Sequence, residues 1–188
     1  MLLPAGVTID GLAGAVQPET GRYVKRLSEL RGLFADADAV DRMVAAEHDP
    51  LVYEVVEYKQ AGSDLFFGTT TMAPGQVGGE YFMTRGHFHQ RRDMGEVYYT
   101  QSGSGILVLE SREGQVETVA MAPGVCAFIP PDWAHRSVNT GVGKLVFVWV
   151  CNAEAGHDYA EILSRGMRKR VMCRAGEAVL VDNASYAA

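Results

Sequence analysis

The spacing of hydrophobic residues changes near residue 50. Between Asp36 and His48, "DADAVDRMVAAEH" places alanine and valine at helical spacing with acidic residues near its start, which predicts a short helix. Asp49-Pro50 ends this helix, because a residue that precedes proline is disfavoured in the α conformation. From Leu51 onward the chain consists of short runs rich in Val, Tyr, Phe, Ile and Thr, separated by turn residues.

These short runs predict strands, and the intervals between them are too short for helices. They are "LVYEVVEYK", "LFFGTTTM", "EYFMT", "EVYYT", "GILVLE", "QVETVAM", "CAFIP", "HRSVN" and "LVFVWV". Many closely spaced strands without intervening helices favour an antiparallel sandwich or barrel. After Cys151, "NAEAGHDYAEILSRG" predicts a loop and a helical turn that Gly166 ends, and "EAVLVD" predicts a final strand. With no repeat or linker, we expect one all-β domain over residues 1–188: an N-terminal extension (1–50), a core barrel (51–150) and a C-terminal segment (151–188).

Composition excludes several classes of function. Of the 188 residues, 47% are hydrophobic and 21% charged, as in ordinary globular proteins. The net charge of −6 disfavours nonspecific binding to nucleic acid or to an anionic membrane. An anionic substrate must therefore be held by local donors. Three separated cysteines fit a reducing compartment, and the N-terminus predicts neither a signal peptide nor a membrane span, so we expect a cytoplasmic location.

The chain has 5 histidines, and two of them, His87 and His89, are one residue apart. On a strand this spacing puts both imidazoles on one face. Glu96 begins the next predicted strand after a turn, and His135 follows the tight turn at 130–132. The plainer interpretation is two surface histidines on an exposed strand, since short motifs often match by chance. The alternative is a metal site formed by His87, His89, Glu96 and His135.

The spacing of these residues favours the metal site. Gly86 directly before His87, Glu96 separated from His89 by six residues and Gly103 separated from Glu96 by six more form one pattern, and Gly124, Pro130, Asp132, His135 and Asn139 form a second. Together they resemble the two signature motifs of the cupin superfamily, which implies a jelly-roll β-barrel with a metal inside. Cupins usually have glycine where Asp132 stands, at a turn position that aspartate also tolerates. Three imidazoles and a carboxylate suit Fe(II), Mn(II), Ni(II), Co(II) or Zn(II) better than Mg or Ca.

A narrower resemblance covers residues 22–183. The segments "RLSELRGLF", "DPLVYEV", "TTTMAPGQVGGEYF", "TRGHFH", "EVYYT", "PPDWAHRSVN", "AGHDY" and "VDN" are similar to those of cupin-type phosphoglucose isomerases. The resemblance implies interconversion of glucose 6-phosphate and fructose 6-phosphate, one divalent metal per chain with Fe(II) as the first expectation, and a homodimer. A metal that binds O1 and O2 of the sugar would stabilise an enediol, and Glu96 is the nearest acidic candidate for the base. A direct hydride shift remains the alternative mechanism.

The same resemblance assigns the substrate contacts. It implies that the sugar phosphate is held by Thr70, Thr84, the Gly86 N–H, His157 and Tyr159, with Arg85 supplying charge. Tyr98 is two residues from Glu96 and shares its face of a strand, so its hydroxyl is a candidate catalytic and substrate contact. Each of these residues also has a structural interpretation. Threonines form strands in any fold, and the alternative role of Tyr98 is to fill the barrel. We interpret Tyr53 and Tyr99 as core or interface aromatics and Trp133 as packing of the turn.

One position departs from the family pattern. Where the family places a tyrosine shortly before "AGHDY", this chain has Cys151, which removes a hydroxyl from the expected pocket.

Two other functions stay open. Another cupin enzyme, either a dioxygenase or an isomerase of a different phosphosugar, would share the metal ligands. A dioxygenase would not need the phosphate donors. A non-catalytic sugar-binding cupin would bind substrate without turnover.

Overall fold

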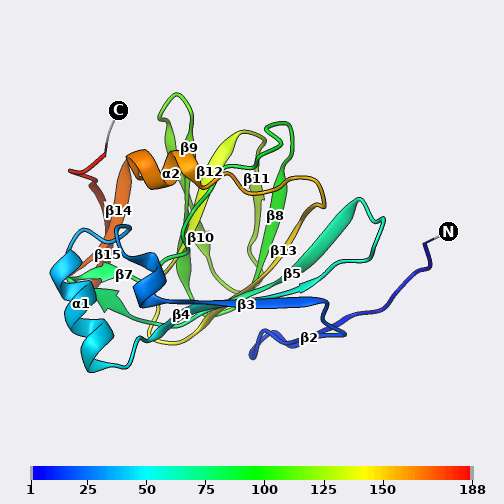
Figure 1. The fold of residues 1–188 in the computed structure, drawn as a ribbon, viewed down its shortest axis with the longest axis horizontal. Coiled ribbons are helices and arrows are strands. Elements are labelled where there is room, and N and C mark those ends of the chain that lie inside the picture. The colour runs from blue at the N-terminus through cyan, green and yellow to red at the C-terminus, as the bar shows by residue number, and fades with distance from the viewer. Residues whose placement is uncertain (1, 187–188) are drawn as a thin grey trace.

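A six-stranded antiparallel sheet forms the centre of the fold in the computed structural model, which describes residues 2–186 (Figure 1). Its strand order is β11-β8-β13-β5-β4-β3. The strands are β11 (Cys126–Ile129), β8 (Glu96–Ser102), β13 (Leu145–Asn152), β5 (Leu65–Met72), β4 (Leu51–Tyr58) and β3 (Gly21–Arg26). The strand β3 was not expected from the sequence, so the N-terminal extension contributes an edge strand as well as a helix.

Register decides which side chains of this sheet face inward. Tyr23 pairs with Val55, Val55 with Thr70, and Thr70 with Phe147, so these four positions form one row across four strands. Because side chains alternate between faces along a strand, the positions two residues away in each strand share that inner face. This face lines the site described below.

A second, three-stranded sheet packs against the first. Its order is β10-β9-β12, with β10 at Val116–Met121, β9 at Gly105–Ser111 and β12 at Trp133–Asn139. Buried Leu107 and Leu109 of β9 belong to the same hydrophobic core as Phe147 and Trp149 of β13. Two packed antiparallel sheets agree with the expected all-β jelly roll, although hydrogen bonding leaves them as separate sheets across residues 2–186.

The two helices lie where the sequence predicted helical structure. Helix α1 spans Ala37–Ala46, and the Asp36 side chain caps it by accepting a 2.8 Å hydrogen bond from the Ala39 N–H. A short 3₁₀ helix, η1 (Leu27–Leu30), precedes it. Helix α2 spans Ala160–Arg165 and ends at Gly166, whose φ of 75° suits glycine. No helix within the described residues is long and apolar enough to cross a membrane.

Two smaller sheets complete the fold. The first has the order β15-β14-β7-β6, with strands at Glu177–Asp182, Lys169–Arg174, Glu80–Tyr81 and Gln76–Val77. It lies beside α1 at one end of the molecule, and the β1–β2 hairpin (Thr8–Ile9 and Val16–Gln17) lies near the opposite end (Figure 1). The hairpin packs on the outer face of the central sheet, where Ser102 Oγ donates a 2.9 Å hydrogen bond to the Gly11 carbonyl.

Candidate active site

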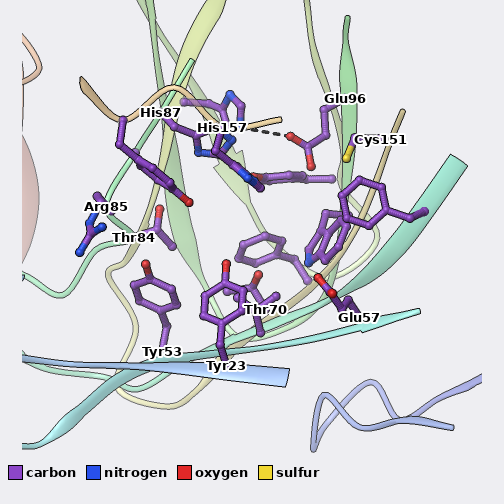
Figure 2. Close-up of a pocket in the computed structure, with 18 residues that line it drawn as sticks. Tyr23, Tyr53, Glu57, Thr70, Thr84, Arg85, His87, Glu96, Cys151 and His157 are labelled. Atoms are coloured by element: carbon purple, nitrogen blue, oxygen red, sulfur yellow. Dashed lines mark ion pairs between the residues drawn. The ribbon is translucent and has the colours of Figure 1, made fainter. Parts of the chain in front are cut away.

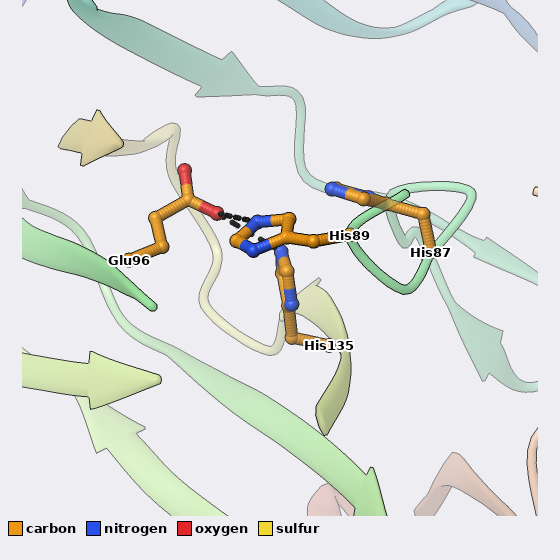
Figure 3. Close-up of side chains that lie close together, drawn as sticks. All are labelled: His87, His89, Glu96 and His135. Carbon is orange, nitrogen blue, oxygen red and sulfur yellow. Dashed lines mark hydrogen bonds and ion pairs between the residues drawn. The ribbon is translucent and has the colours of Figure 1, made fainter. Parts of the chain in front are cut away.

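Four side chains from three parts of the chain form a compact cluster (Figure 3). His87 and His89 follow β7, Glu96 is the first residue of β8, and His135 is the third residue of β12. One ligand atom from each of the four residues lies within 4.8 Å of the other three. The two histidines lie in an irregular segment that makes isolated bridges to β12 and to Asp158, and not in a regular strand.

Hydrogen bonds on the outer ring nitrogens orient two of these imidazoles. His89 Nδ1 lies 2.9 Å from the Met94 carbonyl, and His135 Nδ1 lies 3.2 Å from the Trp133 carbonyl. A carbonyl only accepts, so each Nδ1 carries a proton and each Nε2 faces the cluster, where it can share a proton with Glu96 or, in the neutral ring, offer its lone pair to a metal. The Nε2 atoms of His87 and His135 are buried and donate or accept no hydrogen bond within residues 2–186. Buried nitrogens that converge without partners fit a metal ion.

Burial and mutual charge set the protonation of the cluster. Burial, together with the neighbouring His135, His157 and His89, lowers the pKa of His87 well below its usual value, which leaves the neutral form that binds metals. Burial alone would raise the pKa of Glu96, but the contacts with His135 and His89 lower it to about 2. Burial disfavours the charged form of His89, but the contact with Glu96 outweighs this effect, so the pKa of His89 is raised. The ionised Glu96 therefore attracts positive charge, which a divalent cation can supply.

Packing behind the ligands fixes their direction. Phe88, between the two histidines, is fully buried, and the Arg112 guanidinium lies 4.1 Å from the centre of its ring. Alternation then directs His87 and His89 away from Phe88 and toward the cluster. Before His135, the turn passes through Asp132 with φ at 64°, the left-handed conformation that glycine would adopt there. Arg92 and Arg112 both bind the Asp132 carboxylate, which compensates for that conformation.

The cluster opens into a pocket between the two main sheets, with about 640 Å³ of empty space including its mouth (Figure 2). The pocket is lined by Tyr23, Tyr53, Val55, Glu57, Phe66, Thr70, Thr84, Arg85, Gly86, His87, Glu96, Tyr98, His135, Phe147, Trp149, Cys151, His157 and Tyr159. Of the four clustered side chains, His89 alone is absent from this lining.

All of the substrate-contact candidates from the sequence line this one pocket: Thr70, Thr84, Arg85, Gly86, Tyr98, His157 and Tyr159. His157 and Tyr159 stack with 5.6 Å between ring centres and 11° between planes, and His157 packs at 4.4 Å against His87. In Figure 2, Glu96 and Cys151 lie at one side of the pocket, and Thr84 and Arg85 at the other. Glu96 and the hydrogen-bond donors Thr84 and Arg85 thus lie on opposite sides of the pocket, while His157 packs beside His87 of the cluster.

Tyr98 lines the pocket beside the cluster. Its ring stacks on Phe147 at 4.7 Å and meets His135 edge-on at 5.7 Å. Burial, followed by the charge of Glu96, raises the pKa of the Tyr98 hydroxyl well above its usual value. The hydroxyl therefore stays protonated and is available as a hydrogen-bond donor.

Sequence reasoning missed several residues of the pocket wall. Tyr53, interpreted as a core or interface aromatic, lines the pocket, and so do Tyr23, Glu57 and Trp149. Figure 2 shows Tyr23 and Tyr53 side by side, with hydroxyls directed into the pocket. The alternation of Tyr53, Val55 and Glu57 along β4 was the available signal. Tyr23 had none, because β3 itself was not predicted.

Comparison with known proteins shows the family of this chain. The family model "Glucose-6-phosphate isomerase (GPI)" matches residues 24–188. A glucose-6-phosphate isomerase of Thermococcus gammatolerans is 43% identical over 182 residues, which are 96% of this chain and 95% of that protein. One from Sinorhizobium medicae is 44% identical over 187 residues, covering 97% of this chain and 87% of that protein. A solved oxalate oxidase structure superposes with a TM-score of 0.49 at 15% identity, over 58% of this chain and 56% of that one. The chain belongs to the glucose-6-phosphate isomerase family, in its cupin-type form.

Proposed function

We propose that this protein interconverts glucose 6-phosphate and fructose 6-phosphate with the help of a divalent transition metal. The observation that carries the proposal is the lining of one pocket, in which Glu96 of the candidate metal cluster lies on one side and the candidate phosphate donors Thr84 and Arg85 on the other. The printed names of the relatives agree with this activity.

The proposed metal ligands are His87, His89, Glu96 and His135. Fe(II) is our first choice, because three imidazoles and one carboxylate suit borderline divalent transition metals. A bound ion would act as a Lewis acid for the oxygens on C1 and C2 of the sugar. The chain would supply the remaining chemistry.

Glu96 is the proposed base. The reaction removes a proton from C2 of the aldose and returns it to C1, through an enediol. The ionised state of Glu96, favoured by the contacts with His135 and His89, allows its carboxylate to accept that proton. Tyr98, two residues away on the same face of β8, would donate a hydrogen bond to a substrate oxygen. Burial of both groups excludes water that would otherwise exchange with the proton.

The other end of the pocket would bind the phosphoryl group. Thr70 and Thr84 offer hydroxyls, Gly86 a backbone N–H, and Arg85 a guanidinium whose Nε is buried without a partner among the described residues. The Arg85 guanidinium also lies 5.4 Å from the ring centre of Tyr159, which keeps these two side chains together. Since the chain has a net charge of −6, such local donors must provide the attraction for the anion.

A coupled assay for fructose 6-phosphate formation tests the proposal. The metal-free protein is assayed before and after addition of Fe(II), Mn(II), Ni(II), Co(II) or Zn(II). We expect activity only with metal, and highest with Fe(II). Oxygen consumption on addition of substrate would favour a dioxygenase instead, and substrate binding without turnover would favour a non-catalytic sugar-binding protein.

The homodimer expected from the family resemblance is part of the proposal. Light scattering coupled to size-exclusion chromatography measures it directly. We expect twice the mass of the 20.4 kDa chain. A monomeric mass in an active preparation would show that dimerisation is not required for activity.

A further inference from the structure

A β-bulge directly precedes the proposed metal ligand His87 and contains two of the proposed phosphate donors, Arg85 and Gly86. Residues 83–87 run antiparallel to residues 135–138 of β12, with residue 83 paired to 138 and residue 87 paired to 135. Three residues separate these two pairs on the first segment, but only two on β12. Because the Thr84 N–H donates to the carbonyl of residue 137, Arg85 and Gly86 together stand opposite Arg136. Such a bulge removes backbone groups from the sheet and redirects them.

The side chain of Arg136 binds one of the redirected groups. Its Nη2 donates a 2.7 Å hydrogen bond to the Arg85 carbonyl. In a trans peptide the carbonyl and the following N–H point in opposite directions, so the Gly86 N–H points away from Arg136. Gly86 lines the pocket, and its N–H has no hydrogen-bond acceptor within residues 2–186. The N–H is therefore free to donate to a ligand.

Gly86 also has no room for a side chain. Its φ is 78°, and a Cβ atom there would lie 3.1 Å from Nε and 3.3 Å from Cβ of Arg136. The guanidinium thus packs directly against the back of the Gly86 backbone. Only this thin layer of backbone separates the charge from the pocket.

The charge of Arg136 has no partner in the part of the chain that is described. The residue is 5% exposed, no carboxylate pairs with it, and its Nε makes no hydrogen bond. The neighbouring acids are engaged elsewhere, Glu80 with Arg170 and Glu110 with Arg165. An unpaired buried charge is strongly unfavourable. An anion on the other side of the bulge would compensate for it.

We propose that Arg136 is a positioning residue for the phosphoryl group of the substrate. It holds the Arg85 carbonyl, so that the Gly86 N–H donates into the pocket, and its buried charge attracts the anion across the bulge. The inference rests on the proposed function, since it assigns the donor-rich end to a phosphoryl group. It adds a residue that does not line the pocket.

The test compares metal-loaded Arg136→Met, Arg136→Lys and Arg136→Gln with the parent. Arg42→Met serves as the control, because it removes an arginine whose side chain is 70% exposed on α1. Calorimetry measures the Kd of inorganic phosphate, and the coupled assay measures KM and kcat. For Arg136→Met we expect the Kd of phosphate and the KM of fructose 6-phosphate to rise about tenfold or more, because a charge-assisted contact is lost. Metal content and kcat should stay near those of the parent, and the control should be unchanged.

A folded, fully metallated Arg136→Met protein with the parental Kd for phosphate would overturn the inference. If Arg136→Met does not fold, the phosphate affinities of Arg136→Lys and Arg136→Gln test the inference instead. Both retain a donor for the Arg85 carbonyl, but only lysine retains the charge, so Arg136→Lys should bind phosphate more tightly than Arg136→Gln. Equal, parental affinity in both would refute the role. A parent without isomerase activity whose phosphate affinity still depends on Arg136 would contradict the proposed function alone.

Discussion

The Nε2 atom of His135 lies 3.1 Å from Oε2 of Glu96, and Nε2 of His89 lies 3.1 Å from the same oxygen. Because the Nδ1 atoms of both rings face backbone carbonyls, their Nε2 atoms direct lone pairs at an oxygen that also carries only lone pairs. Acceptors that face each other repel unless a proton or a cation lies between them. A bound divalent ion removes this repulsion, so the metal should stabilise the fold as well as take part in catalysis.

Removal of the metal should therefore lower both activity and Tm. We expect a chelator to abolish the isomerase activity and a divalent transition metal to restore it. A ligand at about 100 times its Kd stabilises a protein by about 2.7 kcal/mol, which thermal unfolding detects easily. Metal analysis of the His135→Ala protein should show strongly reduced binding. Full activity in a sample shown to contain no metal would contradict the proposal.

Substitution of Glu96 tests the base. Glu96→Gln keeps the size of the side chain but cannot accept the proton, so turnover should fall by about 10²–10⁴-fold. Glutamine also weakens metal binding, and the metal content of each sample must therefore be measured with kcat. A fully metallated Glu96→Gln enzyme with near-normal turnover would rule out the base role and would favour a hydride shift.

The sequence predicted the fold class and most central strands, because alternation and turn residues are local signals. It did not predict β3 or β14, since "GRYVKR" and "KRVMCR" carry several cations and little clean alternation. These strands form because neighbouring strands pair with them, which is a tertiary effect.

The clustering of His87, His89, Glu96 and His135 could be predicted for a different reason, namely the spacing of the cupin motifs. That spacing did not show that His87 lies just after a β-bulge, because a bulge depends on the register with β12. Tyr23 and Arg136 were missed on similar grounds. Tyr23 reaches the pocket from β3, a strand that was not predicted. Arg136 lies behind the pocket wall and does not line the pocket.

Phe88 should be essential to the stability of the ligand segment. It is fully buried beneath the Arg112 guanidinium, and a Phe→Ala change at such a site costs about 3–5 kcal/mol. We expect Phe88→Ala to lower the free energy of unfolding by that amount and to weaken metal binding, because both adjacent histidines lose their support. Phe128→Ala is the matched control, since Phe128 is 65% exposed. Equal effects of the two substitutions in urea unfolding would refute the argument.

The phosphate end of the pocket is tested by Tyr159→Phe and Thr84→Val. A charge-assisted hydrogen bond contributes about 1.5–3 kcal/mol, so loss of one should raise KM for fructose 6-phosphate about tenfold or more. Metal content should not change, because neither residue is a ligand. Inorganic phosphate should inhibit the parent more strongly than either variant. Tyr99→Phe, on the outer face of β8, should behave as the parent does, and parental affinity in both test variants would place the phosphoryl group elsewhere.

Asp132 makes part of the stability dependent on pH. Its hydrogen bonds with Arg92, and then with Arg112, lower its pKa from 3.8 to about 2, against a smaller opposing effect of burial. A carboxyl whose pKa is lower in the folded state stabilises the protein above the unfolded pKa, and this contribution disappears as the pH falls toward 2. The side chain is 33% exposed, so screening limits each ion pair to about 1 kcal/mol or less.

Asp132→Asn isolates this contribution, because asparagine tolerates the φ of 64° but carries no charge. Above about pH 4 the parent should have the higher Tm, since its carboxylate is ionised and paired. As the pH falls from about 4 to 2, the two Tm curves should converge, and high salt should reduce the difference at neutral pH because it screens exposed ion pairs. Parallel curves over this range would show that the arginine contacts do not stabilise the turn that presents His135.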